Sequence, residues 1–377
     1  MRYFATEAEA AASDVQAWPL TRRGADLGWV AASSESRVMP SDDEIRETWN
    51  RAEAIRLPGI LFEHLADHES AIRDALTIMR KVRDGESCAD ILSGEPYHSR
   101  LQPDFDLLAP VYNDADEQEI EKVVFDVVKS GELHAEDLWM KCSCLSFHEP
   151  DESIRFRFSY GMEMYKSHEG DLLRERLASE LATRVFPECR VVTEHPELNG
   201  LLAESLGYRP EYVEKIIYSN APEGGALFHQ DVEKGHSGVL YAQLYGHTGW
   251  LTMPREALIT AASVFINDAA NADILERAFP DAADRRHLGA LAADRQTMVE
   301  LMEADDQEVL EVLFNTVPEF TGRLIDDGCG TVLSPGDVIL LPQASTEHCS
   351  WHAVFCLDHE PGHALSFAFI DPSVARL

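Results

Sequence analysis

The sequence predicts an α+β protein with a mostly helical N-terminal part and a β-rich C-terminal half. Apolar residues at helical spacing predict helices over 68–83 and 170–185. Residues 154–160 alternate instead, with apolar side chains on one face and Arg155 and Arg157 on the other, which is typical of a strand. A chain of 377 residues can bury a sizeable core and allows one large domain or two smaller ones.

The composition is strongly acidic, with 32 Lys+Arg against 67 Asp+Glu and a formal net charge of −35. Such a surface repels phosphate backbones and anionic membranes, so neither nucleic acid nor a membrane is an expected partner. The N-terminus lacks the features of a secretory signal, and no apolar run approaches the roughly 18 residues of a bilayer span. Seven scattered cysteines fit a reducing compartment. We therefore expect a soluble, cytoplasmic protein.

Residues 1–137 form the first expected region, which is mostly helical. Residues 1–40 carry little periodic signal and are expected to form an arm or an irregular cover. A serine followed by acidic residues predicts a helix over 42–55, because these residue types favour a helix N-terminus. A further helix is expected between Asp114 and Ser130, where apolar residues recur at helical spacing.

Residues 138–377 form the second expected region, a β-rich domain. A hairpin is expected over 138–162, and the later strands are expected at 213–219, 226–231, 239–253, 337–341, 352–357 and 363–370. Residues 255–328 read as helices inserted between two of these strands. The insertion could be a lid or substrate-selecting cap, a dimerisation element of a homodimer, or a structural cover for an exposed sheet edge.

His229 and Asp231 stand two residues apart at the end of an apolar run. In a strand, side chains i and i+2 leave the same face, so the imidazole and the carboxylate would converge. With one distant histidine they would complete the facial triad that holds non-haem Fe(II) and leaves positions open. His352, which follows Trp351, is the expected third ligand, and His348 competes for that role.

The segments FHQD, LYAQLYGHTGWLTMP, GDVILLP, WHAV and HALSFAFI follow one another in this order. Over residues 215–256 and 331–371 this pattern resembles the JmjC and cupin-type Fe(II)/2-oxoglutarate-dependent oxygenases. The resemblance implies a double-stranded β-helix, a jelly-roll or cupin-like barrel, flanked by the N-terminal helices and carrying the helical insertion. It also implies a dioxygenase that uses O₂, with His229, Asp231 and His352 as iron ligands. Asp231 favours hydroxylation or a related oxidation over halogenation, because halogenating relatives replace this carboxylate by a small residue.

The chain departs from the family pattern where the carboxylate of 2-oxoglutarate is held. The lysine position of many JmjC-type members is Thr248 here, and the position that other members give to arginine is His363. His363 is the first expected co-substrate contact, and Thr248, Gln243 and Tyr218 are further candidates. Simple packing is the alternative for Gln243 and Tyr218.

Arg157 is another candidate anchor, because arginine holds carboxylates bidentately. It lies with Arg155 and Lys141 in a basic concentration that is rare in this acidic chain. The alternative is a solvated strand whose arginines pair with surface acids.

The leading expectation is an Fe(II)- and 2-oxoglutarate-dependent oxygenase that hydroxylates or otherwise oxidises a small polar metabolite or biosynthetic intermediate. A small substrate is expected because the long insertion could close over such a ligand. The alternatives are an Fe(II) oxygenase that does not use 2-oxoglutarate, a peptidyl hydroxylase, and a non-catalytic cupin-like binding protein.

Overall fold

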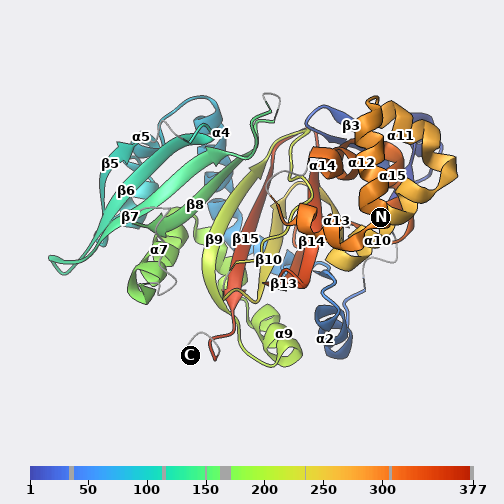
Figure 1. Cartoon of the computed structure of the whole chain (residues 1–377). Helices are drawn as coiled ribbons and strands as arrows, with labels where there is room; N and C mark the ends of the chain where they lie inside the picture. The colour runs from blue at the N-terminus through green and yellow to red at the C-terminus, as the bar shows by residue number, and fades with distance from the viewer. Residues whose placement is uncertain are drawn as a thin grey trace.

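The computed structural model describes residues 1–33, 38–112, 116–148, 151–161, 171–233, 235–304 and 308–373. Within these ranges the chain is mixed α+β and is built on an antiparallel sheet of 12 strands. Strands fill the middle of the molecule, a twisted wing of strands extends to one side, and a group of helices lies on the other side (Figure 1).

The central strands form two groups that face each other. In the first group β9 (Glu211–Asn220), β15 (Gly362–Ile370), β10 (Gly238–Tyr245) and β13 (Val338–Ser345) lie side by side in this order, and β4 (Ile55–Leu57) pairs with β13. The second group contains β14 (His348–Cys356), β11 (Thr248–Pro254) and β12 (Gly330–Leu333). The two groups join at the β13–β14 hairpin, where Gln343 pairs with Cys349 and Ser345 pairs with His348. The strands expected from residue 213 onward are confirmed, with one exception. The prediction of a strand over 226–231 is wrong, because this segment meets β14 only through an isolated bridge between His229 and His352 and a few backbone hydrogen bonds.

A small apolar core fills the space between the two groups. Val239 and Ile339 of the first group belong to the same buried cluster as Trp250, Leu333 and Val354 of the second. Because strand side chains alternate between faces, the inward positions of both groups share this interior.

Beyond β9 the sheet continues into the wing, through β8 (Ile154–Tyr160), β7 (Glu132–Cys144), β6 (Glu119–Lys129) and β5 (Phe105–Val111). The main core packs the wing against helices, with Phe156 and Phe158 buried in it. The alternation expected for 154–160 is therefore confirmed. The helices of this part are α2 (Asp42–Asn50), α3 (Phe62–Leu65), α4 (Glu69–Arg83), α5 (Cys88–Leu92), α6 (Tyr97–Leu101), α7 (Leu172–Val185), α8 (Arg190–Thr193) and α9 (Pro196–Leu206).

The prediction of a helix between Asp114 and Ser130 is wrong, because β6 occupies most of this stretch. Val123, Phe125 and Val127 are buried at every second position, which is the period of a strand. β6 lies between β5 and β7, and these neighbours satisfy its backbone hydrogen-bonding groups. The expected boundary at residue 137 falls inside β7, so the two expected regions share one sheet.

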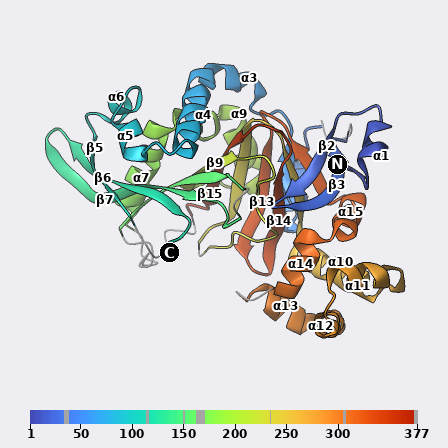
Figure 2. The same cartoon turned by 90° about the horizontal axis from the view of Figure 1, so that it is seen from above.

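The N-terminus is more ordered than an irregular arm. Strands β1 (Arg2–Phe4), β3 (Ala25–Ala31) and β2 (Ala17–Arg22) form a separate small sheet beside α1 (Glu7–Ala11). It lies next to the inserted helices in both views (Figures 1 and 2). These are α10 (Arg255–Asn267), α11 (Ala272–Ala278), α12 (Ala282–Ala293), α13 (Arg295–Met302), α14 (Glu308–Thr316) and α15 (Pro318–Asp326).

The insertion packs on the second strand group. Phe265 and Phe314 of the insertion share a buried cluster with Leu251, Met253 and Phe355 of β11 and β14. The insertion is therefore anchored to β11 and β14 by a buried apolar contact.

In the part of the chain that the structure describes, no single helix is long and apolar enough to cross a bilayer. The pair Arg255–Asn267 and Ala269–Ala278 meets the criteria of length and composition only when taken together, and it is bent by 72°.

Candidate metal centre

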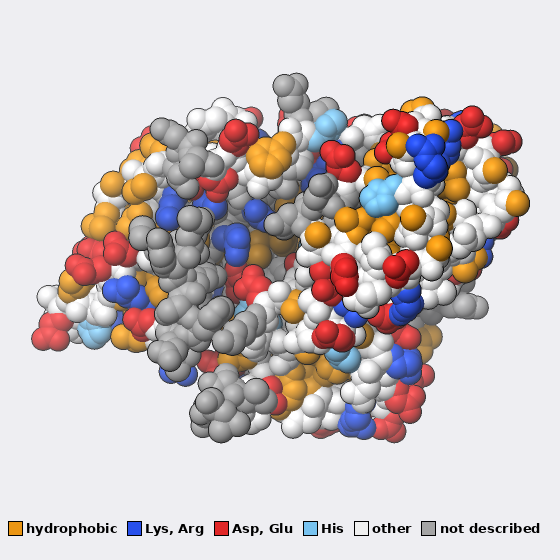
Figure 3. Space-filling model, in the orientation of Figure 1, with side chains coloured by type: hydrophobic (Ala, Val, Ile, Leu, Met, Phe, Trp, Pro, Cys, Tyr) orange, Lys and Arg blue, Asp and Glu red, His pale blue; other side chains and the backbone are white. Residues whose placement is uncertain are grey.

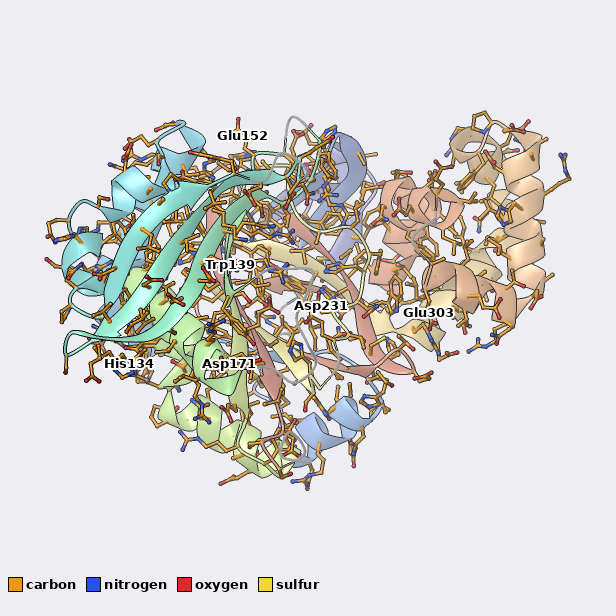
Figure 4. All side chains as sticks on the ribbon, turned by 60° about the vertical axis from the view of Figure 1, so that its left-hand side comes forward. His134, Trp139, Glu152, Asp171, Asp231 and Glu303 are labelled. Atoms are coloured by element: carbon orange, nitrogen blue, oxygen red, sulfur yellow. The ribbon has the colours of Figure 1, made fainter. Side chains whose placement is uncertain are left out.

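His229, Asp231 and His352 meet at one point. The backbones of His229 and His352 exchange two hydrogen bonds, with N···O distances of 3.0 and 2.9 Å, which place the two residues directly opposite each other. Asp231 lies between the imidazoles, with His229 Nε2 3.4 Å from Oδ1 and His352 Nε2 3.4 Å from Oδ2. The three potential ligand atoms lie within 4.8 Å of one another. Figure 4 shows Asp231 in the middle of the molecule, between the wing and the inserted helices.

Both imidazoles are oriented by backbone carbonyls. Nδ1 of His229 lies 2.7 Å from the carbonyl oxygen of Leu227, and Nδ1 of His352 lies 3.3 Å from that of Ser350. When each Nδ1–H donates to its carbonyl, the lone pair of each Nε2 is directed toward Asp231. This arrangement of a second hydrogen bond behind the ligating nitrogen is usual for metal-binding histidines.

Gln343 of β13 connects the ligands from behind. Its Oε1 accepts from the backbone N–H of Asp231 at 3.2 Å, and its Nε2 donates to the carbonyl of Ser350 at 2.8 Å. The Ser350 carbonyl is the group that orients His352. Gln343 was not among the predicted site residues, and the only signal for it in the sequence is an amide side chain directly after the apolar run 338–342.

Glycine is required just before the segment 226–231, which carries His229 and Asp231 and is called the metal segment below. Gly225 has φ +129°, and a Cβ there would lie 2.1 Å from the carbonyl oxygen of Val354. Only glycine tolerates this conformation and this close approach. Gly225 therefore lets the chain run against β14, so that His229 reaches His352.

The same segment is held from outside by the N-terminal strand and the insertion. Arg22 of β2 is buried and donates to the carbonyl of Ala226 at 2.7 Å and to Oδ1 of Asn315 at 2.8 Å. Oδ1 of Asn315, on α14, also accepts from the backbone N–H of Phe228 at 2.9 Å. Two elements distant in sequence thus fix the backbone that leads to His229. The sequence carries no local signal for this contact.

The local electrostatics suit Asp231 and His352 to metal binding, whereas they favour the protonated form of His229. Burial raises the pKa of Asp231, but the two imidazoles outweigh it and hold this pKa well below its usual range. Burial, followed by His229, lowers the pKa of His352. Burial lowers the pKa of His229, but Asp231 raises it by more, so its net shift is upward. At neutral pH the site therefore presents an ionised carboxylate and a neutral His352, as a divalent cation requires.

The donor set fits a divalent transition metal with open coordination positions. Two imidazoles and one carboxylate form the facial arrangement of non-haem Fe(II) sites, and zinc also accepts such ligands. The side chain of His352 is 3% exposed, whereas those of His229 and Asp231 are 41% and 38% exposed. One side of the group is thus closed by protein, and the other side is accessible.

The accessible side opens into a pocket of about 220 Å³. Apolar and aromatic side chains form part of its wall, and charged side chains of β8 and β9 form another part. In the space-filling view, basic side chains lie beside acidic ones between the wing and the helical part (Figure 3). The lining includes Arg155, Arg157, Glu214, Tyr218, Asn220, Glu233, Val239, Tyr241, Trp250, Leu341, Val354 and Ser366.

Two of the expected co-substrate residues line this pocket. Arg157 does so, and its guanidinium also pairs with Glu214 at 2.7 Å, so part of the surface-pairing alternative holds as well. Tyr218 lines the pocket from β9. Burial, with a further contribution from Asp231, raises the pKa of Tyr218, so its hydroxyl remains protonated at neutral pH.

Thr248 and Gln243 are fully buried behind the pocket wall. The Thr248 hydroxyl donates to Oε1 of Gln243 at 2.9 Å and accepts from the indole N–H of Trp250 at 3.0 Å. Tyr241 donates to the same oxygen of Gln243 at 3.3 Å. Both residues thus position the aromatic side chains that line the pocket, and neither belongs to the lining.

The placement of His363 does not support a co-substrate contact. Its ring is fully buried, with Nε2 3.0 Å from Oε1 of Glu188. Ser366 and Ala368 of the same strand line the pocket, and strand alternation turns the odd-numbered residue His363 to the opposite face. His348, the competitor of His352, lies at the start of β14, outside the cluster.

Comparison of the sequence with protein-family models and with curated proteins finds no match.

Proposed function

We propose that this protein is a non-haem Fe(II)- and 2-oxoglutarate-dependent oxygenase that oxidises a C–H bond of a small polar molecule. The observation that carries the proposal is the convergence of His229, Asp231 and His352 with both Nε2 atoms directed toward the carboxylate. Such a group of side chains at the wall of an accessible pocket is what an iron site open to ligands requires.

The strand order supports a double-stranded β-helix. The first group runs β9, β15, β10, β13, and in the second group the segment around His229 pairs with β14, which pairs with β11 and then β12. Two facing groups of four, with the chain passing repeatedly from one group to the other, are the arrangement that the oxygenase resemblance implies. The metal segment and β14 would then lie next to each other in one group.

When bound, Fe(II) supplies the redox chemistry that couples the conversion of 2-oxoglutarate and O₂ to succinate and CO₂ with substrate oxidation. The protein side chains hold and shield this centre. Asp231 provides the anionic ligand, and Gln343 keeps its backbone in place. Trp250 stacks on His352, with ring centroids 5.5 Å apart, and helps exclude water from that side. The pocket of about 220 Å³ lies below the roughly 300–1,000 Å³ of sites for drug-sized ligands, which favours a small substrate.

Anaerobic spectroscopy tests the proposal. Fe(II) added with 2-oxoglutarate should produce the weak visible charge-transfer band of a chelated 2-oxo acid, and Fe(II) alone should not. Asp231→Ala should abolish the band and iron retention. His348→Ala should keep both, because His348 lies outside the cluster. Iron retention by Asp231→Ala equal to that of the unmodified protein would contradict the assignment.

One observation favours a second candidate, an Fe(II) oxygenase that takes its electrons from the substrate. Thr248 and His363 hold the two positions at which the family pattern has a cation, and neither lines the pocket. Iron binding without a band from 2-oxoglutarate, and O₂ uptake without succinate formation, would select this candidate.

A further inference from the structure

We propose that Arg155, supported by Arg157 and Tyr218, forms a carboxylate-binding subsite in the wall of the metal pocket. The proposal rests on the proposed function and deepens it, because it names the chemical class of the ligand as an acid. The carboxylate could belong to the co-substrate, as the distal group of a 2-oxo diacid, or to the substrate.

Three cations lie on neighbouring strands of the wing, Lys141 on β7 and Arg155 and Arg157 on β8, and they differ in their partners. Lys141 pairs with Asp116 at 2.7 Å, and Arg157 pairs with Glu214 at 2.7 Å. Arg155 instead donates from Nε to the hydroxyl of Ser143 at 3.2 Å, and no described carboxylate lies within ion-pair distance of it.

This partnering leaves the fork of Arg155 available. Within the described residues, its two terminal nitrogens have no hydrogen-bond acceptor, although the chain contains about twice as many acidic as basic residues. Two parallel N–H groups of a guanidinium match the two oxygens of a carboxylate. An arginine in a pocket of an acidic protein, without a described acidic partner, is suited to bind an anionic ligand.

The neighbours of Arg155 complete the subsite. Arg155 pairs in register with Tyr218 across β8 and β9, and both side chains line the metal pocket. The Tyr218 hydroxyl has no hydrogen-bond partner among the described residues, so it can donate to the same carboxylate. Nε of Arg157 is buried and also lacks a described partner. Glu233, a further acid of the lining, makes no ion pair with Arg155 in the described structure.

The first experiment uses glutarate, a diacid that lacks the 2-oxo group, and the metal-free full-length protein. Isothermal titration calorimetry should detect binding to the unmodified protein, and Arg155→Met should weaken it about tenfold or more. Arg155→Lys should restore part of the affinity, because it keeps the charge but loses the fork. Arg176→Met is the matched control, since Arg176 is 72% exposed on α7, outside the pocket lining, and it should bind glutarate normally.

Two results would overturn the proposal: no glutarate binding by the unmodified protein, or equal affinity in Arg155→Met. Circular dichroism and thermal unfolding verify that Arg155→Met is folded. If it is not folded, Arg155→Lys takes its place, and a glutarate affinity equal to that of the unmodified protein would then overturn the proposal. Because no metal is present, a failure of the iron assignment leaves this result unaffected.

The second experiment distinguishes the two sources of the carboxylate. With Fe(II) and without O₂, 2-oxoglutarate is compared with 2-oxobutanoate, which chelates in the same way but lacks the distal carboxylate. If Arg155→Met weakens the binding of 2-oxoglutarate about tenfold and leaves the binding of 2-oxobutanoate unchanged, the subsite holds the co-substrate. If it weakens neither keto acid yet has lost glutarate binding, the subsite holds a carboxylate of the substrate.

Discussion

Replacing Gln343 with leucine should weaken metal binding more than its effect on stability alone would suggest. The Gln343 amide is fully buried and connects the backbone N–H of Asp231 to the carbonyl of Ser350. That carbonyl also accepts from Nδ1 of His352 at 3.3 Å. One side chain therefore supports two of the three expected ligands.

The magnitude follows from the two lost hydrogen bonds. Each neutral hydrogen bond contributes about 1 kcal/mol, and a poorly satisfied buried carbonyl adds a further desolvation cost. Gln343→Leu should thus lower the free energy of unfolding of the metal-free protein by about 2–3 kcal/mol. Loss of an outer-shell partner typically costs 10–100-fold in metal affinity, so we expect a decrease of about this size.

Gln243→Leu is the matched control. Gln243 is also fully buried. Its side-chain amide forms hydrogen bonds with Tyr241, Tyr245 and Thr248, but with none of the expected metal ligands. Urea unfolding should show a comparable loss of stability, whereas anaerobic titration with Fe(II) should show unchanged affinity. Equal metal affinities of the two variants would refute a positioning role for Gln343.

Three further changes test the fold and the site. Gly225→Ala should destabilise the protein by more than about 2 kcal/mol in urea unfolding, because of its positive φ and the contact with the Val354 carbonyl; Gly289→Ala, where a methyl group meets open space in a helix, should stabilise it by about 0.5–1 kcal/mol. Phe125→Ala should cost about 3–5 kcal/mol if β6 is a buried strand, and Asp126→Ala less than about 0.5 kcal/mol. Removing bound Fe(II) with a chelator should lower the midpoint of thermal unfolding, because free Fe(II) at about 100 times Kd adds roughly 2.7 kcal/mol to the free energy of unfolding. An unchanged midpoint would argue against a metal bound in the native state.

Local patterns predicted several elements correctly. Helical spacing placed α4 and α7 to within two residues, and alternation placed β8, because one face of each element packs in the main core. The error at β6 has the same origin. Its apolar residues fit the helical period as well as the strand period, and the decision came from pairing with β5 and β7.

The co-substrate candidates show a second limit of local patterns. The sequence could suggest His363 from its position in a motif, but the register of β15 turns the ring toward Glu188. It also suggested Arg157, whereas the structure pairs Arg157 with Glu214. Arg155 has no carboxylate partner among the residues that the structure describes. Partners of this kind come from other strands, so residue type and spacing do not reveal them.

The sequence by itself determined that His229 and Asp231 could point to one place, because the spacing of side chains along a strand is a property of the backbone. Only the tertiary structure decided that His352, more than 100 residues later, completes the group. That contact depends on how β14 is paired and on how Gly225 lets two backbones approach each other. Long-range register of this kind is a result of packing the whole chain, and no local stretch of sequence contains it.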